Sequence, residues 1–420
     1  MKISRLAGVA ALLAAGFAQA QEVKLNAIVE FWYTQMMDSN LRLNSAAPGG
    51  YMTNPSLDAA FKENQFSHRR TEIYLNGKMT DKLTWGVMFD PNNSTSTVGN
   101  NILNDAWVNY QFTPAFGLKA GQFKPLQTWE ASMVGTAGFM FYQRSLGSRL
   151  VGDRRDRGIV ATYGFGDAKG FNGKMNLGIF NGTSDDGSAG KNADANAQKD
   201  WVARLEMGFG SDHKFGTYYR EGVTAVKDFG LPVQTGWTGA GYVNAPTSTQ
   251  ILDNKDKTTN LGAYYVYETS KWQASAEVIT GLLGRRNATV FLVATPAARQ
   301  HLDQKYMAYT FSGVYKMGNH QITARYDYLN YNEGDDWYSA TNPYTTTVAT
   351  GVATGNDYSP KYTEAILGYN YVFNPAKFSF AKLKVNYIMR SDNFLQPRTS
   401  AGQIGEQGGN SVVASIMVGF

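Results

Sequence analysis

The chain has 420 residues, a formal net charge of +5 at pH 7, 44 glycines, 25 tyrosines and no cysteine. The lack of cysteine excludes disulfides, thiolate nucleophiles and cysteine-ligated zinc sites. The weak positive charge does not favour a nucleic-acid binder, which usually has a concentrated basic face or a high charge on the domain.

The first twenty residues have the pattern of an export signal. Lys2 and Arg5 form a short basic start, residues 6–17 are apolar, and residues 18–20 read Ala-Gln-Ala, an A-x-A cleavage site. The apolar run is shorter than the roughly 20 residues that a membrane-spanning helix needs. We therefore expect residues 1–20 to be a cleaved signal peptide and residues 21–420 to form a single exported domain.

After this segment, apolar and polar residues alternate with a period of two. In residues 82–90 every second residue is large and apolar, namely Leu83, Trp85, Val87 and Phe89. Strict alternation over such windows predicts strands with one apolar and one polar face. We predict sixteen strands, near residues 23–37, 66–79, 82–90, 103–112, 116–124, 156–165, 173–182, 200–209, 213–221, 259–268, 271–283, 304–317, 320–331, 361–373, 377–390 and 410–420.

The connections between these strands alternate between short and long. Thr80-Asp81 and Ser211-Asp212 are short, whereas 38–65 and 332–360 are long. Short turns at one end and long loops at the other are typical of a barrel of the bacterial outer membrane. A closed barrel also satisfies every backbone polar group in lipid, and sixteen strands leave a water-filled lumen. The predicted fold class is therefore all-β, a sixteen-stranded antiparallel transmembrane β-barrel.

Aromatic residues near the predicted strand ends suit the two interfacial girdles of such a barrel. They are Phe31, Tyr33, Tyr110, Phe112, Tyr163, Phe165, Phe373 and Phe378. In the last strand, alternation places Val412, Ile416 and Phe420 on the lipid side, and a terminal phenylalanine there resembles the assembly signal of bacterial outer-membrane barrels.

The third long connection ends in FYQRSLGSRLVGDRRDRG, residues 141–158, which holds five arginines and only two acids. A loop folded into a barrel narrows the pore, and its charges set ion selectivity. Arginine suits an anion site because its planar guanidinium stays charged and pairs bidentately with phosphate or carboxylate. We therefore expect the third extracellular loop to fold inward and to bind anions through Arg144, Arg149, Arg154, Arg155 and Lys124.

Arg157 has the lipid-facing parity of its strand, so we expect it at the extracellular end of that strand. An alternative for the whole arginine cluster is that it binds lipopolysaccharide phosphates outside the barrel, or acidic residues at a subunit contact.

The predicted inner wall carries both signs of charge. The basic residues expected to line the pore are Arg70, Lys78, Lys82, Lys119, Arg204, Arg220, Arg325, Lys382 and Lys384. The acids on the same parity are Glu30, Glu72, Asp105, Glu206, Glu277 and Asp327. Because the wall is mixed, a strong anion preference has to come from the constriction.

Three stretches carry a family resemblance: LNDAWVNYQF (103–112), LKAGQFKP (118–125) and RSLGSRLVGDRRDRGIVATYGFG (144–166). Together with the strand pattern, they resemble the phosphate-selective porin O/P family. The resemblance implies a trimeric porin that passes small anions, phosphate among them, through a lumen narrowed by the third loop. Many members of this family are general porins, so passage of other solutes remains open.

The sequence contains weaker signals for an enzyme or metal-binding protein and for a sugar channel. The histidines His68, His213, His301 and His320 form no H-E-x-x-H motif and no serine lies in G-x-S-x-G, so we expect no enzyme. The acidic stretches near 185–186 and 253–256 lack EF-hand spacing, and we expect neither a metal nor a cofactor. A sugar or organic-solute channel remains the alternative, because Trp32, Tyr74 and Trp107 have lumen parity.

Overall fold

The computed structural model describes residues 22–37, 64–91, 102–152, 155–167, 169–182, 198–224, 237–238, 241–242, 256–283, 304–330, 333, 361–374, 380–391 and 410–420. The signal peptide predicted at residues 1–20 lies outside these ranges, as do Arg154 and Phe378. Their expected roles stay predictions.

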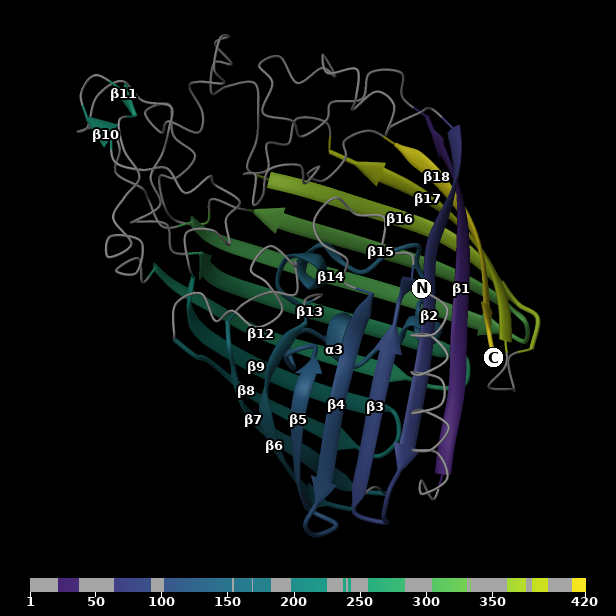
Figure 1. Cartoon of the computed structure of the whole chain (residues 1–420). Coiled ribbons are helices and arrows are strands. Elements are labelled where there is room, and N and C mark those ends of the chain that lie inside the picture. The colour runs from purple at the N-terminus through teal and green to yellow at the C-terminus, as the bar shows by residue number, and fades with distance from the viewer. Residues whose placement is uncertain are drawn as a thin grey trace, which may run out of the picture.

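Sixteen strands among the described residues form one closed antiparallel barrel (Figure 1). β18 pairs with β1, with Val418 opposite Val29, and this pairing closes the sheet. β9 pairs directly with β12, because β10 (Trp237–Thr238) and β11 (Gly241–Tyr242) form a separate pair. The predicted fold class and strand number are confirmed.

The barrel strands follow the predicted segments, with ends that differ by up to three residues. They are β1 (Glu22–Met36), β2 (Asn64–Lys78), β3 (Leu83–Phe89), β4 (Leu103–Gln111), β5 (Phe116–Phe123), β6 (Asp156–Gly166), β7 (Phe171–Phe180), β8 (Asp200–Phe209), β9 (His213–Thr224), β12 (Asp256–Glu268), β13 (Trp272–Leu283), β14 (Gln304–Met317), β15 (His320–Asn330), β16 (Lys361–Val372), β17 (Phe380–Arg390) and β18 (Ser411–Gly419).

The barrel has an apolar outer face and a polar inner face. In β15, Ile322 and Tyr326 are exposed, whereas Thr323, Arg325 and Asp327 are buried. This is the reverse of a water-soluble protein, in which apolar residues are the buried ones. An apolar outer band is what a lipid environment requires.

Aromatic side chains gather at the end of the barrel where the short turns lie. Phe112 contacts Phe116, and Phe209 contacts both Phe171 and Phe215, with ring centroids 5.1–5.8 Å apart. The exposed Phe112 and Phe373 were predicted for such a girdle, and rings at this depth suit the interface between lipid and water.

Two β-bulges break the alternation of side chains. The pairing of β1 with β2 shifts after Glu30, so Arg69 has no partner residue on β1. The pairing of β3 with β4 shifts after Met88 and leaves Asn104 as the extra residue. A bulge turns two successive side chains toward one face, which the period of two does not predict.

The segment between β5 and β6, residues 124–152 and called the strap below, contains only short helical turns. These are α3 (Trp129–Ser132), η2 (Thr136–Gly138) and η3 (Ser148–Gly152). No helix in the described ranges is long and apolar enough to cross a membrane. Figure 1 shows α3 in front of the far wall of the barrel rather than beyond its ends.

The strap leaves and rejoins the barrel at the motif residues that carry the family resemblance. Gly121 pairs with Gly158, and Phe123 pairs with Asp156. Gly121 has a φ of 135°, and a Cβ there would lie 2.2 Å from the carbonyl oxygen of Ala106. Only glycine fits this position, because other residues rarely adopt such a backbone.

Candidate functional site

Inward-facing lysines of β17 bind the middle of the strap. Lys382 Nζ donates to the carbonyl oxygens of Ala137 and Phe139, at 3.1 Å each. Lys384 Nζ donates to the carbonyl oxygen of Phe141 at 3.3 Å and contacts Glu30 at 2.8 Å. Both lysines are buried, so their charges interact with groups of the protein and not with solvent.

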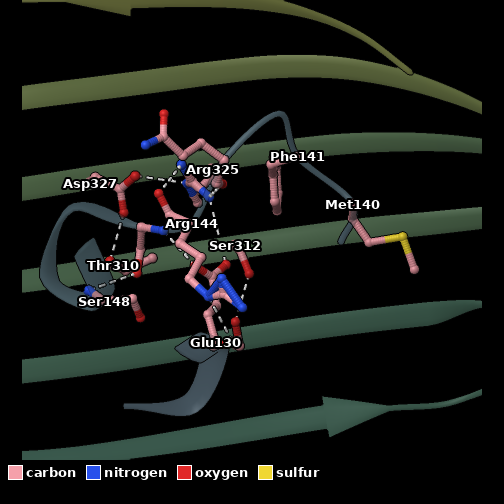
Figure 2. A network of polar contacts seen from close by, with 12 residues as sticks. Glu130, Met140, Phe141, Arg144, Ser148, Thr310, Ser312, Arg325 and Asp327 are labelled. Carbon is pink, nitrogen blue, oxygen red and sulfur yellow. Dashed lines mark hydrogen bonds and ion pairs between the residues drawn. The ribbon is translucent and has the colours of Figure 1, made fainter. Parts of the chain in front are cut away.

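Arg325 of β15 makes the next set of contacts, shown in Figure 2. Its guanidinium donates to the carbonyl oxygens of Gln143 at 2.7 Å and Arg144 at 3.2 Å. The same group lies 2.7 Å from Asp327 and 3.6 Å from Glu130 of α3. Arg325 therefore fixes the backbone on which the Arg144 side chain is carried.

Glu364 of β16 is the common partner of three arginines. Arg149 of the strap lies 3.3 Å from this carboxylate, Arg325 3.3 Å and Arg390 of β17 3.1 Å. The Tyr142 hydroxyl donates to it at 2.7 Å. Burial and the Glu364 charge raise the pKa of Tyr142, which keeps this hydroxyl protonated.

The start of the strap is held by β8 and β13. The backbone N–H of Trp129 donates to Glu277 Oε1 at 2.8 Å, and Arg204 donates to the carbonyl oxygen of Thr128 at 3.3 Å. Thr128 also caps α3 by accepting from the N–H of Ala131. The strap is thus bound to the inner wall along its length.

Several cations predicted to line the pore are used in these contacts. Arg149, Arg325, Lys382 and Lys384 bind the strap or its acidic partners. Arg220 lies 2.5 Å from Asp200 and 3.4 Å from Asp156. Arg220, Arg325, Lys382 and Lys384 lie on the inner side of the barrel as the alternation predicts, but acids and carbonyl oxygens occupy the donors of all five cations.

A cavity of about 540 Å³ lies between the strap and the wall formed by β2 to β8. Eight basic side chains line it, against four acidic ones. The basic residues are Arg69, Arg70, Lys119, Lys124, Arg144, Arg155, Lys174 and Arg204, and the acids are Glu72, Asp90, Asp105 and Glu206.

Three of the four acids each contact one arginine of the cavity. Arg70 lies 3.2 Å from Glu72, Arg155 lies 2.6 Å from Asp105, and Arg204 lies 3.3 Å from Glu206. Arg70 also contacts Glu30 at 2.9 Å. These pairs cancel much of the charge of the three arginines and their acids.

Three of the remaining cations rest on aromatic rings. Lys119 Nζ lies 4.2 Å from the Trp107 ring centroid and 4.4 Å from that of Phe123. Arg144 lies 4.2 Å from the Phe139 ring and Arg69 lies 4.8 Å from the Trp32 ring. A ring orients a cation without cancelling its charge.

The structure adds two basic cavity residues that the sequence reasoning missed. Arg69 reaches the cavity because of the bulge in β2, which sequence periodicity does not reveal. Lys174 follows the ordinary alternation of β7. Its neighbours Met175 and Leu177 are exposed on the outer face, so the sequence period alone could have placed Lys174 on the inner face.

Two predicted pore residues lie at the short-turn rim instead. Lys78 is half exposed at the end of β2, 3.8 Å from Glu22. The prediction for Lys82 is wrong: it precedes β3, which begins at Leu83, and is exposed in the turn. The turn needs residues 79–82, so the strand cannot start as early as the alternation suggested.

Three of the predicted histidines are described, and each is exposed. His68 lies 2.6 Å from the Thr71 hydroxyl, His213 2.8 Å from the Tyr265 hydroxyl and His320 2.6 Å from the Tyr369 hydroxyl. Across the described ranges, no three histidine or acidic side chains come together in a way that could hold a metal ion.

Comparison with known proteins supports the fold. The outer-membrane channel DcaP of Acinetobacter baumannii has a TM-score of 0.55 at 11% identity, covering 95% of this chain and 97% of that chain. The Comamonas acidovorans anion-selective porin has a TM-score of 0.51 at 12% identity, covering 95% and 99%. At such identities the likeness concerns the fold alone, and no curated protein sequence matches the chain.

The family is given by the sequence itself. A model of the family described as phosphate-selective porin O and P matches residues 56–401, which is most of the chain. The chain therefore belongs to the phosphate-selective porin O and P family and is a porin of the bacterial outer membrane.

Proposed function

We propose that the cavity is the narrow part of a water-filled channel through which small anions diffuse, and that the protein is not an enzyme. The observation that carries the proposal is the excess of basic over acidic side chains around the cavity. Such an excess raises the local concentration of anions and lowers that of cations.

We further propose that the strap is the third extracellular loop and forms the constriction. Arg144 and Lys124 would act there as selectivity residues, because each lines the cavity. Arg155 also lines the cavity and would contribute less, because Asp105 lies 2.6 Å from it and cancels much of its charge. Arg149 contacts Glu364 and would act by holding the strap in place, and Arg154 remains a proposed member of the cluster. The anion-selective porin with a similar fold supports this assignment.

Phosphate is the proposed preferred anion, on the strength of the family alone. The arginines and lysines around the cavity could bind its oxygens. The alternative, a sugar channel, is less well supported, because Arg69 and Lys119 each cover one face of Trp32 and Trp107, two of the three aromatic residues it would need.

The test is the zero-current potential of the wild-type channel in planar bilayers under a KCl gradient. We expect chloride to permeate better than potassium, and a cation preference would refute the proposal. The double variant R69Q/R144Q should lower the preference several-fold, whereas Lys169→Gln, at an exposed turn, should leave it unchanged. Phosphate added to one side should reduce the chloride current if the channel prefers phosphate.

The family resemblance also supports a homotrimer as the assembled form. Chemical cross-linking of the protein in native outer membranes tests this directly. Cross-linked species of two and three chains are expected, and a single-chain species at all cross-linker concentrations would contradict it.

A further inference from the structure

Two residues of the family motifs lie on the outer face of the barrel and take no part in the channel. Gln122 of β5 and Arg157 of β6 are cross-strand partners. Their neighbours Phe123 and Asp156 are buried on the inner side, so the alternation turns Gln122 and Arg157 outward. The direction of Arg157 agrees with the prediction from the sequence.

The bulge in β4 builds the support for this pair. The side-chain amide of Gln122 donates to the carbonyl oxygens of Leu103 at 3.0 Å and Asn104 at 2.8 Å. Its oxygen accepts from Arg157 Nε at 3.2 Å. Every polar atom of the Gln122 side chain is thus in use, and it holds the arginine in one orientation.

The terminal nitrogens of Arg157 remain available. Within the part of the chain that the structure describes, the Arg157 side chain has Gln122 as its one bonded partner. The surrounding outer face is apolar, with Val108, Ile159 and Leu177 each about half exposed. An arginine on a lipid-facing strand is costly at the membrane centre and costs little near the interface, so its partner should lie in the headgroup layer.

The depth of Arg157 in the membrane supports this. Asp156 begins β6, so Arg157 stands at the end of the barrel opposite the short turns. Outward-facing lysines stand at the same end of three other strands: Lys257 on β12, which pairs with Glu221 at 3.0 Å, Lys305 on β14 and Lys361 on β16. The opposite end carries the aromatic girdle instead.

This distribution favours a lipid over a second copy of the chain. The outward cations stand on β6, β12, β14 and β16, within an arc of nine consecutive strands, so their common partner has to face about half of the wall. A leaflet of phosphorylated lipids surrounds the whole barrel and carries the complementary charge.

We propose that Arg157, oriented by Gln122, binds a phosphate group of a phosphorylated lipid in the outer leaflet. The guanidinium keeps two terminal nitrogens for the phosphate oxygens, which is the geometry that arginine uses for bidentate binding. This site is separate from the cavity and does not depend on the ion preference of the channel. It assigns the motif residues Gln122 and Arg157 a role in lipid contact.

The experiment compares lipid binding to the full-length barrel in detergent by native mass spectrometry. The probes are diphosphorylated lipid A and the same lipid with its phosphates removed. The wild-type protein should retain diphosphorylated lipid A and should lose the lipid from which the phosphates were removed. Arg157→Gln should weaken retention about tenfold, because one charge-assisted contact is lost.

Two further variants separate positioning from charge. Q122A keeps the Arg157 charge but frees its side chain, and should weaken retention less than Arg157→Gln. Lys271→Gln, in a short turn at the other end, is the matched control and should behave as wild type. Folding of each variant is checked by its heat-dependent mobility in gels.

Either of two results would overturn the proposal. Equal retention of both lipids by wild type would show that the phosphate is not recognised. If Arg157→Gln changes the number of chains per particle and leaves lipid retention unchanged, Arg157 serves a subunit contact instead.

Discussion

Two sides of the same barrel use inward-facing cations in opposite ways. On the wall of β2 to β8, cations line an open cavity, and several of them rest on aromatic rings. On the wall of β13 to β17, the cations bind the strap and buried acids, as Arg325 does with Gln143 and Asp327. An inward direction therefore does not make a residue part of the pore.

The difference lies in what occupies the donors of each cation. A guanidinium that meets carbonyl oxygens and a carboxylate has its charge compensated locally, whereas Lys119, which rests on the rings of Trp107 and Phe123, keeps its field in the lumen. The strap creates this asymmetry, because it covers one side of the inner wall and leaves the other open.

The largest expected effect comes from removing the acid at the centre of the strap contacts. Glu364→Gln leaves the buried charges of Arg149, Arg325 and Arg390 without their shared carboxylate. Breaking a buried ion pair from one side costs about 3–5 kcal/mol. We expect a clearly lower urea midpoint for unfolding in detergent.

The matched control for this variant is Glu221→Gln. Glu221 is an exposed acid on β9 that pairs with Lys257 at 3.0 Å, and its loss should leave the midpoint nearly unchanged. Equal midpoints for the two variants would contradict the central role of Glu364.

A pair of lysine variants tests the two sides directly. Lys119→Gln removes a cavity cation and should lower the chloride preference without lowering stability. Lys382→Gln removes two hydrogen bonds to the strap and should cost about 1–3 kcal/mol. Zero-current potentials and urea unfolding, both measured on both variants, should show this crossed pattern. If Lys119→Gln lowers the urea midpoint and leaves the chloride preference unchanged, the proposed difference between the wall of β2 to β8 and the wall of β13 to β17 is wrong.

The sequence predicted the fold well because the alternation of a strand leaves little freedom. Once Ile322 faces lipid, Arg325 has to face inward, and the structure agrees. A β-bulge interrupts the alternation locally, so the period of two did not predict that Arg69 faces the cavity. The partners of the inward cations could not be predicted either, because Lys384 and Glu30 meet only when β18 joins β1 and β17.

The path of the strap is the other feature that periodicity cannot give. Its sequence has no regular period, and its position depends on side chains from distant strands such as Glu277 and Asn370. The arginine cluster was located correctly between β5 and β6, but Arg144, Arg149 and Arg155 have three different environments.

A smaller effect is expected from ionic strength. The cavity cations act on passing ions through water, where the screening length falls from about 10 Å at 0.1 M salt to about 3 Å at 1 M. The chloride preference of wild type should therefore decline as KCl rises over this range. The Lys119→Gln channel should show a weaker dependence on salt. A preference that stays constant would point to direct binding of dehydrated anions instead of a diffuse field.

The smallest effect is expected at the short-turn rim. Lys82 was predicted to line the pore, but it is exposed in the turn before β3 and is absent from the residues that line the cavity. A charge so exposed is surrounded by water and screened by salt. The chloride preference of Lys82→Gln should therefore equal that of wild type within experimental error. Lys119→Gln, measured in the same bilayers, supplies the comparison. If the two variants lower the preference equally, the rim contributes to selectivity as much as the cavity, and the side of the barrel would matter less than the total charge.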